Sequence, residues 1–289
     1  MTIRKKKIST LDAVLYSILL FVAAVTLYPL LNLLAVSFSS RAAYVRNPLM
    51  IFPSDINLGA YKTVFKNRLL WTSYGNTIIV TFFGVIVSMF LTSTMAYPLS
   101  EQTLKGRKGI SALFLFTMFF SGGMIPNYYL VRSLGMLNTL WSLIIPGALS
   151  VYNAMLMKNS FESLPPSLKE SARIDGANDL TIFVRIALPL SLPIIATLTL
   201  FYAVGQWNSY FSALLYTSSR RDKWTLQLLL REIITTSASM LDDGTAIETL
   251  PAESIRYATI VLATAPILCV YPFLQKYFVK GMMVGAVKG

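Results

Sequence analysis

Residues 158–187 read KNSFESLPPSLKESARIDGANDLTIFVRIA, a charged and polar stretch set between apolar runs at 133–157 and within 186–219. A membrane span needs about 20 apolar residues to cross a hydrocarbon core about 30 Å thick. Each flanking run meets or nearly meets that length. This stretch, called the polar segment below, is therefore predicted to project from a membrane between two crossings.

The polar segment is predicted to contain two short helices joined by a glycine. Pro165 and Pro166 mark the start of the first helix, because proline fits the first helical turn. Gly176 is well placed to end that helix in the left-handed conformation, and Asn178 or Asp179 can cap the second helix. We therefore expect a projecting knob of helix, turn and helix.

Two interpretations of this knob follow from its residues alone. It is either an amphipathic connector on the membrane surface or a docking helix that inserts into a groove of a soluble partner. The small residues Ala172, Gly176 and Ala177 would allow such a partner to approach closely. Glu170 and Arg173 are spaced for an i,i+3 ion pair on the first helix.

The rest of the chain is typical of a helical membrane protein. Hydrophobic residues make up 55% of the chain and charged residues 13%, whereas a soluble protein carries about 25% charged residues. Six apolar runs qualify as spans, at 11–38, within 69–100, and at 109–131, 133–157, within 186–219 and 257–275. We therefore predict an all-α, polytopic membrane protein with six transmembrane helices. The third of these is expected to bend or end early near 121–126.

An even number of spans places both chain ends on one side of the membrane. Basic clusters at 4–7, 105–108 and 276–288 fall on that side, which the positive-inside rule identifies as cytoplasmic. The net charge of +12 is then explained by anchoring residues that meet anionic membrane lipid, so no nucleic-acid partner is expected. The predicted organisation is a cytoplasmic N-terminus at 1–10, one transmembrane domain at 11–280 including the polar segment, and a cytoplasmic tail at 281–289.

A catalytic centre is not expected in this chain. The sequence has no histidine, which is the commonest general base and metal ligand, and no Gly-x4-Gly-Lys-Ser/Thr phosphate-binding loop. The single cysteine, Cys269, lies in an apolar run and cannot form an intrachain disulfide. We therefore predict no catalytic residue, metal site or bound cofactor.

The polar segment resembles the EAA loop of bacterial ABC importer permeases. The pattern of that loop is Glu-Ala-Ala, three residues, Gly, nine residues and Ile-x-Leu-Pro. Here it reads Glu170-Ser171-Ala172, Gly176 and Ile186-Ala187-Leu188-Pro189, with both spacings intact. Ser171 is the one departure, and serine is nearly as small as alanine. The resemblance implies that an ATPase docks on Glu170, Ser171, Ala172, Asp175, Gly176, Ala177, Ile186 and Pro189.

Other parts of the chain extend this resemblance to carbohydrate permeases of the maltose-transporter type. The tail at 275–289 is similar to their C-terminus, and residues 120–127 and 204–210 resemble the branch that handles oligosaccharides and breakdown products of complex polysaccharides. The resemblance implies a type I ABC importer permease fold, in a multi-pass protein of the bacterial cytoplasmic membrane that forms half of a translocation pore. It also implies a second homologous permease, two subunits that bind ATP and Mg, an extracytoplasmic sugar-binding protein and an oligosaccharide substrate.

Five residues are candidates for a substrate pathway. Gln206, Trp207 and Asn208 lie inside the fifth apolar run with Tyr210 close by, and Asn153 lies in the fourth. Sugars bind to aromatic faces and to amide or hydroxyl groups, and polar residues within spans usually face the bundle interior. The competing explanations are helix–helix hydrogen bonds for the amides and an interfacial belt for the aromatic residues. Residues 217–255 are a candidate external loop for contact with the binding protein.

The alternatives from other functional classes are an ion-coupled secondary transporter and a membrane scaffold subunit. Secondary transporters usually carry carboxylates within the membrane. The six apolar runs contain only Asp12, which lies at the edge of the first. The polar segment, read as a docking helix, argues against a scaffold.

Overall fold

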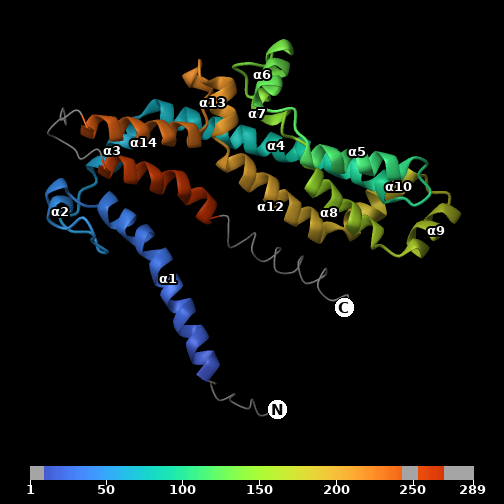
Figure 1. Ribbon diagram of the computed structural model, residues 1–289, viewed down its shortest axis with the longest axis horizontal. Coiled ribbons are helices and arrows are strands. Elements are labelled where there is room, and N and C mark those ends of the chain that lie inside the picture. Colours follow the sequence, from blue (N-terminus) through green and yellow to red (C-terminus); the bar gives the residue numbers. More distant parts are fainter. Residues whose placement is uncertain (1–9, 243–252, 270–289) are drawn as a thin grey trace. The chain divides into compact units, whose positions relative to one another are not determined.

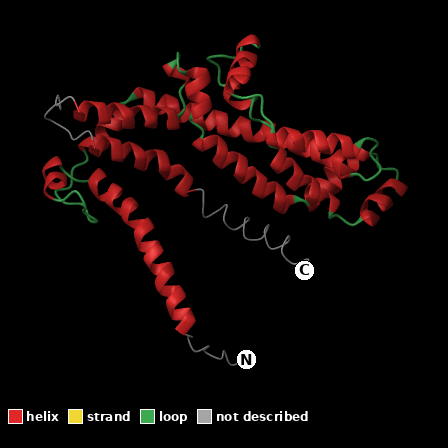
Figure 2. Cartoon of the chain, in the orientation of Figure 1, coloured by secondary structure: helices red, strands yellow, loops and turns green. Residues whose placement is uncertain are grey.

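The computed structural model describes residues 10–242 and 253–269, and within these ranges helices make up all of the regular secondary structure (Figure 2). The predicted all-α class is therefore confirmed for the described residues. The chain divides into two compact units, one of residues 1–67 and 230–264 and the other of residues 68–229 and 265–289. The predicted N-terminus at 1–10 and tail at 281–289 lie outside the described residues, apart from Thr10.

Figure 1 labels most of the helices, which are numbered in chain order. They are α1 (Thr10–Ser37), α2 (Arg41–Arg46), α3 (Gly59–Lys66), α4 (Arg68–Ser100), α5 (Arg107–Phe119), α6 (Met124–Ser133), α7 (Trp141–Ile144), α8 (Val151–Glu162), α9 (Pro166–Ile174), α10 (Asp179–Ile182), the π-helix η1 (Phe183–Ala187), α11 (Leu188–Leu190), α12 (Leu192–Asn208), α13 (Phe211–Thr217), the 3-10 helix η2 (Arg221–Lys223) and α14 (Leu226–Asp242). Residues 253–269 are also helical.

In the first unit, α1 is a long apolar helix that holds a folded loop at its C-terminal end. Its only buried residues are Ala35, Val36 and Ser37, as expected for a helix that otherwise faces lipid. The Asn32 side-chain amide donates hydrogen bonds to the carbonyl oxygens of Pro48 and Met50, both at 2.9 Å. This intramembrane amide therefore fixes the loop that follows α1.

In the second unit, α4 is the central helix, and α7, α8 and α12 pack against it (Figure 1). Small residues recur every four positions along its buried face, at Gly84, Ser88, Thr92 and Ala96. Residues four apart lie on one side of a helix, and small side chains let neighbouring helices approach closely in a membrane. This repeat is called the small-residue stripe below. Its small side chains allow the helices that pack on α4 to approach closely.

The predicted spans agree with the structure only in part. By length and composition, α1 and α4 can each cross a membrane, and the described residues provide up to four crossings if two bent helix pairs are included. Since part of the sixth run lies outside the described residues, the predicted count of six is not confirmed. The expected bend of the third run is confirmed, because α5 and α6 meet at 110° around Gly123, whose φ is +89°.

The fourth run, 133–157, was wrongly predicted to form one helix. It is divided into a turn at Gly135, the short helix α7, a break at 146–150 and then α8. Gly135 has φ +66°, which an ordinary side chain rarely adopts, and Pro146 and Gly147 lie in the break. The sixth run, 257–275, is helical to residue 269 and lies outside the described residues beyond that.

Candidate functional site

The polar segment forms the predicted helix, turn and helix. Pro166 is the first residue of α9, and the helix ends with Gly176 at φ +81°. Asn178 caps α10 by accepting a hydrogen bond from the Thr181 backbone N–H at 2.8 Å. The predictions for the proline start, the glycine turn and the cap are confirmed, with Asn178 rather than Asp179 as the cap.

The turn at Gly176 is a Schellman motif. The backbone N–H of Ala177 donates to the carbonyl oxygen of Ala172 at 2.9 Å, and that of Gly176 donates to the carbonyl oxygen of Arg173 at 3.1 Å. These two bonds satisfy carbonyl groups that the end of a helix leaves without intrahelical partners. The motif requires the left-handed conformation, which explains why a glycine stands at 176.

The inner face of the polar segment packs against a buried cluster of the second unit. Ala172, Ala177 and Ile186 are partly buried there, against residues that include Phe161 and Ile182. The small side chains of Ala172 and Ala177 therefore bring α9 close to the helices of this chain itself. The part of Ala172 and Ala177 that meets this cluster is not available to an ATPase. Their predicted contact with an ATPase stays a prediction.

The outer face of the segment is exposed. Among the predicted docking residues, those exposed are Glu170, Ser171, Asp175, Gly176 and Pro189. Two large apolar side chains lie beside them, Ile174 at 86% exposure and Leu180 at 69%. Exposed apolar groups on a polar knob are typical of a protein-binding surface, and the sequence interpretation missed both.

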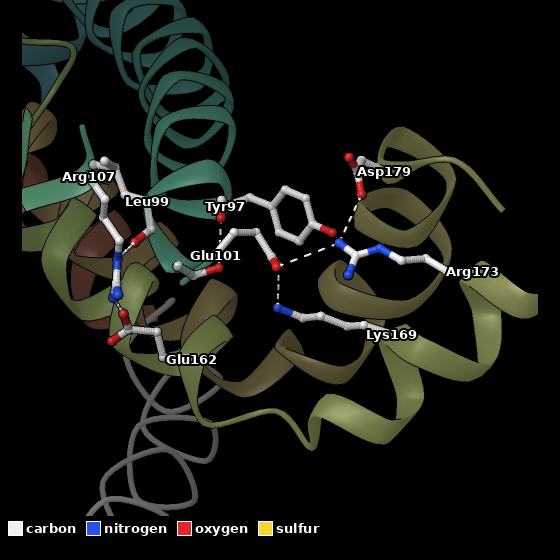
Figure 3. Close-up of polar contacts among 9 residues, drawn as sticks. Tyr97, Leu99, Glu101, Arg107, Glu162, Lys169, Arg173 and Asp179 are labelled. Atoms are coloured by element: carbon white, nitrogen blue, oxygen red, sulfur yellow. Dashed lines mark hydrogen bonds and ion pairs between the residues drawn. The ribbon is translucent and has the colours of Figure 1, made fainter. Parts of the chain in front are cut away.

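The predicted ion pair between Glu170 and Arg173 is wrong. Arg173 instead contacts the Asp179 carboxylate at 3.1 Å and the Glu101 carboxylate at 3.7 Å (Figure 3). The hydrogen bond to Asp179 raises the pKa of the Arg173 guanidinium, which therefore stays charged. The carboxylates of Asp179 and Glu101 therefore take the place of Glu170, the partner that helical spacing suggested for Arg173.

Glu101 connects the polar segment to α4. It directly follows the end of that helix, and its carboxylate receives the Lys169 ammonium at 2.5 Å (Figure 3). The same ammonium lies 5.5 Å from the centre of the Tyr97 ring, an arrangement that adds a cation–π attraction. Sequence reasoning did not identify Glu101. The available signal was that it is the one acidic residue in the basic stretch 101–108.

A second ion pair joins the start of α5 to the end of α8. The Arg107 guanidinium contacts the Glu162 carboxylate, and its Nε donates to the carbonyl oxygen of Leu99 at 2.8 Å (Figure 3). Lys158 shares the same carboxylate at 2.9 Å. The end of α4 is therefore connected both to α8 and to the polar segment.

A cavity of about 620 Å³ lies farther along the second unit, lined by residues of α6, α7, α8, α12 and α13 and of the turns between them. Asn153 and Gln206, both predicted for the substrate pathway, line it. The lining adds Asn127, Tyr202 and Tyr216, and among its described residues none carries a charge. Amide, hydroxyl and aromatic groups without charge suit a neutral, hydroxyl-rich ligand.

The other three predicted pathway residues lie outside the cavity lining. The Asn208 amide donates to the Val204 carbonyl oxygen of its own helix at 2.9 Å. Trp207 is half-buried, and Tyr210 makes an edge contact with the Phe211 ring. The structure therefore brings Asn153 and Gln206 together but places Trp207, Asn208 and Tyr210 elsewhere.

The cavity wall is coupled to the small-residue stripe of α4. The Tyr202 hydroxyl is 2.7 Å from the Thr92 hydroxyl and accepts from the Ser150 backbone N–H at 3.2 Å. A Cβ atom at Gly84 would lie 3.1 Å from the Gln206 amide, so the glycine leaves room for that side chain. The helix that carries Glu101 at its end therefore also shapes the cavity.

Comparisons with known proteins agree along the whole chain. The sequence model of the family described as "Binding-protein-dependent transport system inner membrane component" matches residues 5–284. Protein LplC of Bacillus subtilis is 47% identical, over 93% of this chain and 91% of that protein. The polygalacturonan/rhamnogalacturonan transport system permease protein YtcP of the same organism is 44% identical, over 96% of this chain and 98% of that protein.

Solved structures give the same result. A chain of a bacterial ABC transporter involved in the import of the acidic polysaccharide alginate is 35% identical, with a TM-score of 0.86 over 96% of this chain and 100% of that chain. A chain of the bacterial alginate ABC transporter in complex with a periplasmic protein bound to alginate pentasaccharide has 18% identity and a TM-score of 0.59, over 91% of this chain and 93% of that chain. The second likeness supports the fold alone.

Proposed function

Since the chain belongs to the family of binding-protein-dependent transport system inner membrane components, it is a non-enzymatic, multi-pass permease subunit of an ABC importer, and we propose that it forms half of an oligosaccharide pore. A second, homologous permease provides the other half. An extracytoplasmic sugar-binding protein delivers the substrate, and the complex lies in the bacterial cytoplasmic membrane.

The neutral cavity supports an oligosaccharide as the substrate. Its volume of about 620 Å³ falls within the range of about 300–1,000 Å³ that is usual for ligand pockets. Amide groups of Asn127, Asn153 and Gln206 can donate to and accept from sugar hydroxyls, and the Tyr202 and Tyr216 rings provide aromatic surface. Trp207, Asn208 and Tyr210, which lie outside the lining of this cavity, remain part of the proposed substrate pathway.

The exposed face of the polar segment is the proposed docking site for an ATP-binding subunit. Two such subunits bind ATP and Mg, and this chain binds neither. The docking set is Glu170, Ser171, Asp175, Gly176 and Pro189, with Ala172, Ala177 and Ile186 supporting it from the inner face. The observation that carries this proposal is the direct link from α9 to the end of α4 through Lys169 and Glu101.

The test is purification of the chain in mild detergent, followed by identification of the subunits that accompany it. We expect an ATP-binding subunit to co-purify with the natural chain and to be lost from Gly176→Asp, which places a charged side chain at the left-handed turn. Gly106→Asp is the matched control, since Gly106 also has a left-handed backbone, at φ +78°, with open space around it. Retention of the ATPase and of sugar uptake in Gly176→Asp would contradict the docking site.

Uptake measurements separate this function from an ion-coupled secondary transporter. Import in proteoliposomes should require ATP and persist when a protonophore and a sodium ionophore abolish ion gradients. Import that follows an ion gradient without ATP would favour the secondary transporter. The family membership and the relatives named above favour the ABC importer over both alternatives.

A further inference from the structure

A groove of about 320 Å³ lies between α5 and α8. It is lined by Arg107, Lys108, Ser111, Ala112, Leu115 and Lys158. The five residues from α5 recur at spacings of three and four, which places them on one side of that helix. The groove is basic at the start of α5 and becomes apolar one to two turns later.

The basic end of the groove carries more positive than negative charge. Three cationic side chains, those of Arg107, Lys108 and Lys158, face the single carboxylate of Glu162 and leave a net charge of +2. Burial, and then the neighbouring Arg107, lower the pKa of the Lys158 ammonium. An anion in the groove would offset this repulsion.

Two hydrogen-bond donors in the groove are available to a ligand. Among the described residues, neither the Lys108 ammonium nor the Ser111 hydroxyl forms a hydrogen bond or ion pair with another protein group. Lys108 is exposed, and Ser111 is half-buried beside it on the next turn. Arg107, in contrast, already pairs with Glu162 and donates to the Leu99 carbonyl oxygen, so these contacts fix the position of its side chain at one side of the groove.

Beyond the apolar end of the groove, α5 has further exposed apolar side chains. In the described structure α5 buries none of its residues, and Leu113, Phe116 and Phe119 are 63%, 54% and 77% exposed. The helix starts only seven residues after α4 ends at Ser100, on the side predicted to be cytoplasmic. We therefore expect the basic residues at the depth of lipid headgroups and the apolar residues at the depth of acyl chains.

We propose that this groove binds an anionic phospholipid. Its phosphodiester is held by Lys108, Lys158 and Ser111, and an acyl chain lies along Ala112 and Leu115. Basic pockets between membrane helices on the cytoplasmic side are suited to such headgroups. A free phosphate would use the basic end alone and leave the adjoining apolar surface uncovered, which favours the lipid. The proposal needs only the membrane orientation and does not depend on the sugar.

Native mass spectrometry of the assembled transporter in detergent tests this site. Phosphatidylglycerol and phosphatidylcholine are titrated separately against the natural complex, Lys108→Gln, Lys108→Arg and Ser111→Ala. Each basic residue near a membrane surface strengthens binding of anionic lipid by about fivefold. We therefore expect Lys108→Gln to bind phosphatidylglycerol about fivefold more weakly and Lys108→Arg to recover it.

Lys105→Gln is the matched control. It removes one positive charge three positions before Lys108, but Lys105 lines a different cleft, beside Glu101 and Arg173. Equal phosphatidylglycerol binding by Lys108→Gln and the natural complex, or equal losses in Lys108→Gln and Lys105→Gln, would overturn the proposal. So would equal binding of the two lipids, or displacement of the lipid by millimolar inorganic phosphate. Lys108 is exposed, so its variants should assemble normally, which co-purification of the other subunits verifies.

Discussion

Replacement of Glu101 by glutamine tests whether the polar segment moves α4 through this one carboxylate. Glu101 receives the Lys169 ammonium at 2.5 Å and lies 3.7 Å from the Arg173 guanidinium, with 21% of its side chain exposed. Glutamine has nearly the same shape and still accepts a hydrogen bond, so the variant removes little besides the charge. The change therefore isolates the electrostatic attachment of α9.

The magnitude follows from the two contacts. Hydrogen bonds to charged groups contribute about 1.5–3 kcal/mol. The 3.7 Å contact adds little, because Arg173 keeps Asp179 at 3.1 Å. Lys169 also keeps its position over the Tyr97 ring. We therefore expect Glu101→Gln to weaken the attachment by about 1.5 kcal/mol, which is roughly a tenfold change in its equilibrium constant.

The assay compares ATP hydrolysis with sugar uptake in proteoliposomes that contain the whole transporter. ATP hydrolysis should persist, because the exposed docking face is unchanged, while the sugar imported per ATP should fall several-fold. Asp179→Asn is the control, since its carboxylate is 75% exposed and exposed pairs contribute less than about 1 kcal/mol. An unchanged transport ratio in Glu101→Gln, or an equal fall in Asp179→Asn, would refute the reasoning.

Three further predictions concern the turn and the cavity. Gly176→Ala should destabilise the C-terminal end of α9 by about 1 kcal/mol, because alanine disfavours the left-handed backbone at this position. Amide hydrogen exchange there should become faster. Gly176→Asn should have a smaller effect, because asparagine tolerates that conformation. Gly84→Ala should shift Gln206 slightly, because the new Cβ would lie 3.1 Å from the Gln206 amide, and should alter sugar-stimulated ATPase activity. Gly75→Ala, in open space on the same helix, should leave that activity unchanged. Tyr202→Phe should lower the free energy of unfolding by about 1 kcal/mol, because it removes the hydrogen bonds to Thr92 and to the Ser150 N–H. The measurement is a lower Tm, and an unaltered Tm would contradict this prediction.

Features set by nearby residues could be predicted from the sequence. The turn at Gly176 and the cap at Asn178 depend on atoms within a few positions of each, so residue type and spacing were sufficient. The bend near Gly123 was predictable for the same reason. Membrane character followed from the long uncharged runs alone.

Features that depend on distant contacts were missed. Glu101 meets Lys169 across 68 positions of sequence, and the resulting network displaced the pair expected from helical spacing. The apolar run at 133–157 gave the composition of a span, but Gly135 and the 146–150 break divide it. Of five pathway candidates, composition could not distinguish Gln206, which lines the cavity, from Asn208, which bonds to its own helix.

The small-residue stripe on α4 has a mechanical consequence. Large interdigitating side chains resist displacement of one helix along another, because each must leave its groove before the helices can slide. At Gly84, Ser88, Thr92 and Ala96, α4 has small side chains instead. The helices that touch this stripe therefore meet a lower steric barrier to small shear movements, while the Thr92–Tyr202 hydrogen bond and the Gln206 side chain at Gly84 fix their resting register. A transporter that changes conformation in every cycle requires helices that can shift against one another, and the small-residue stripe favours such shifts around α4.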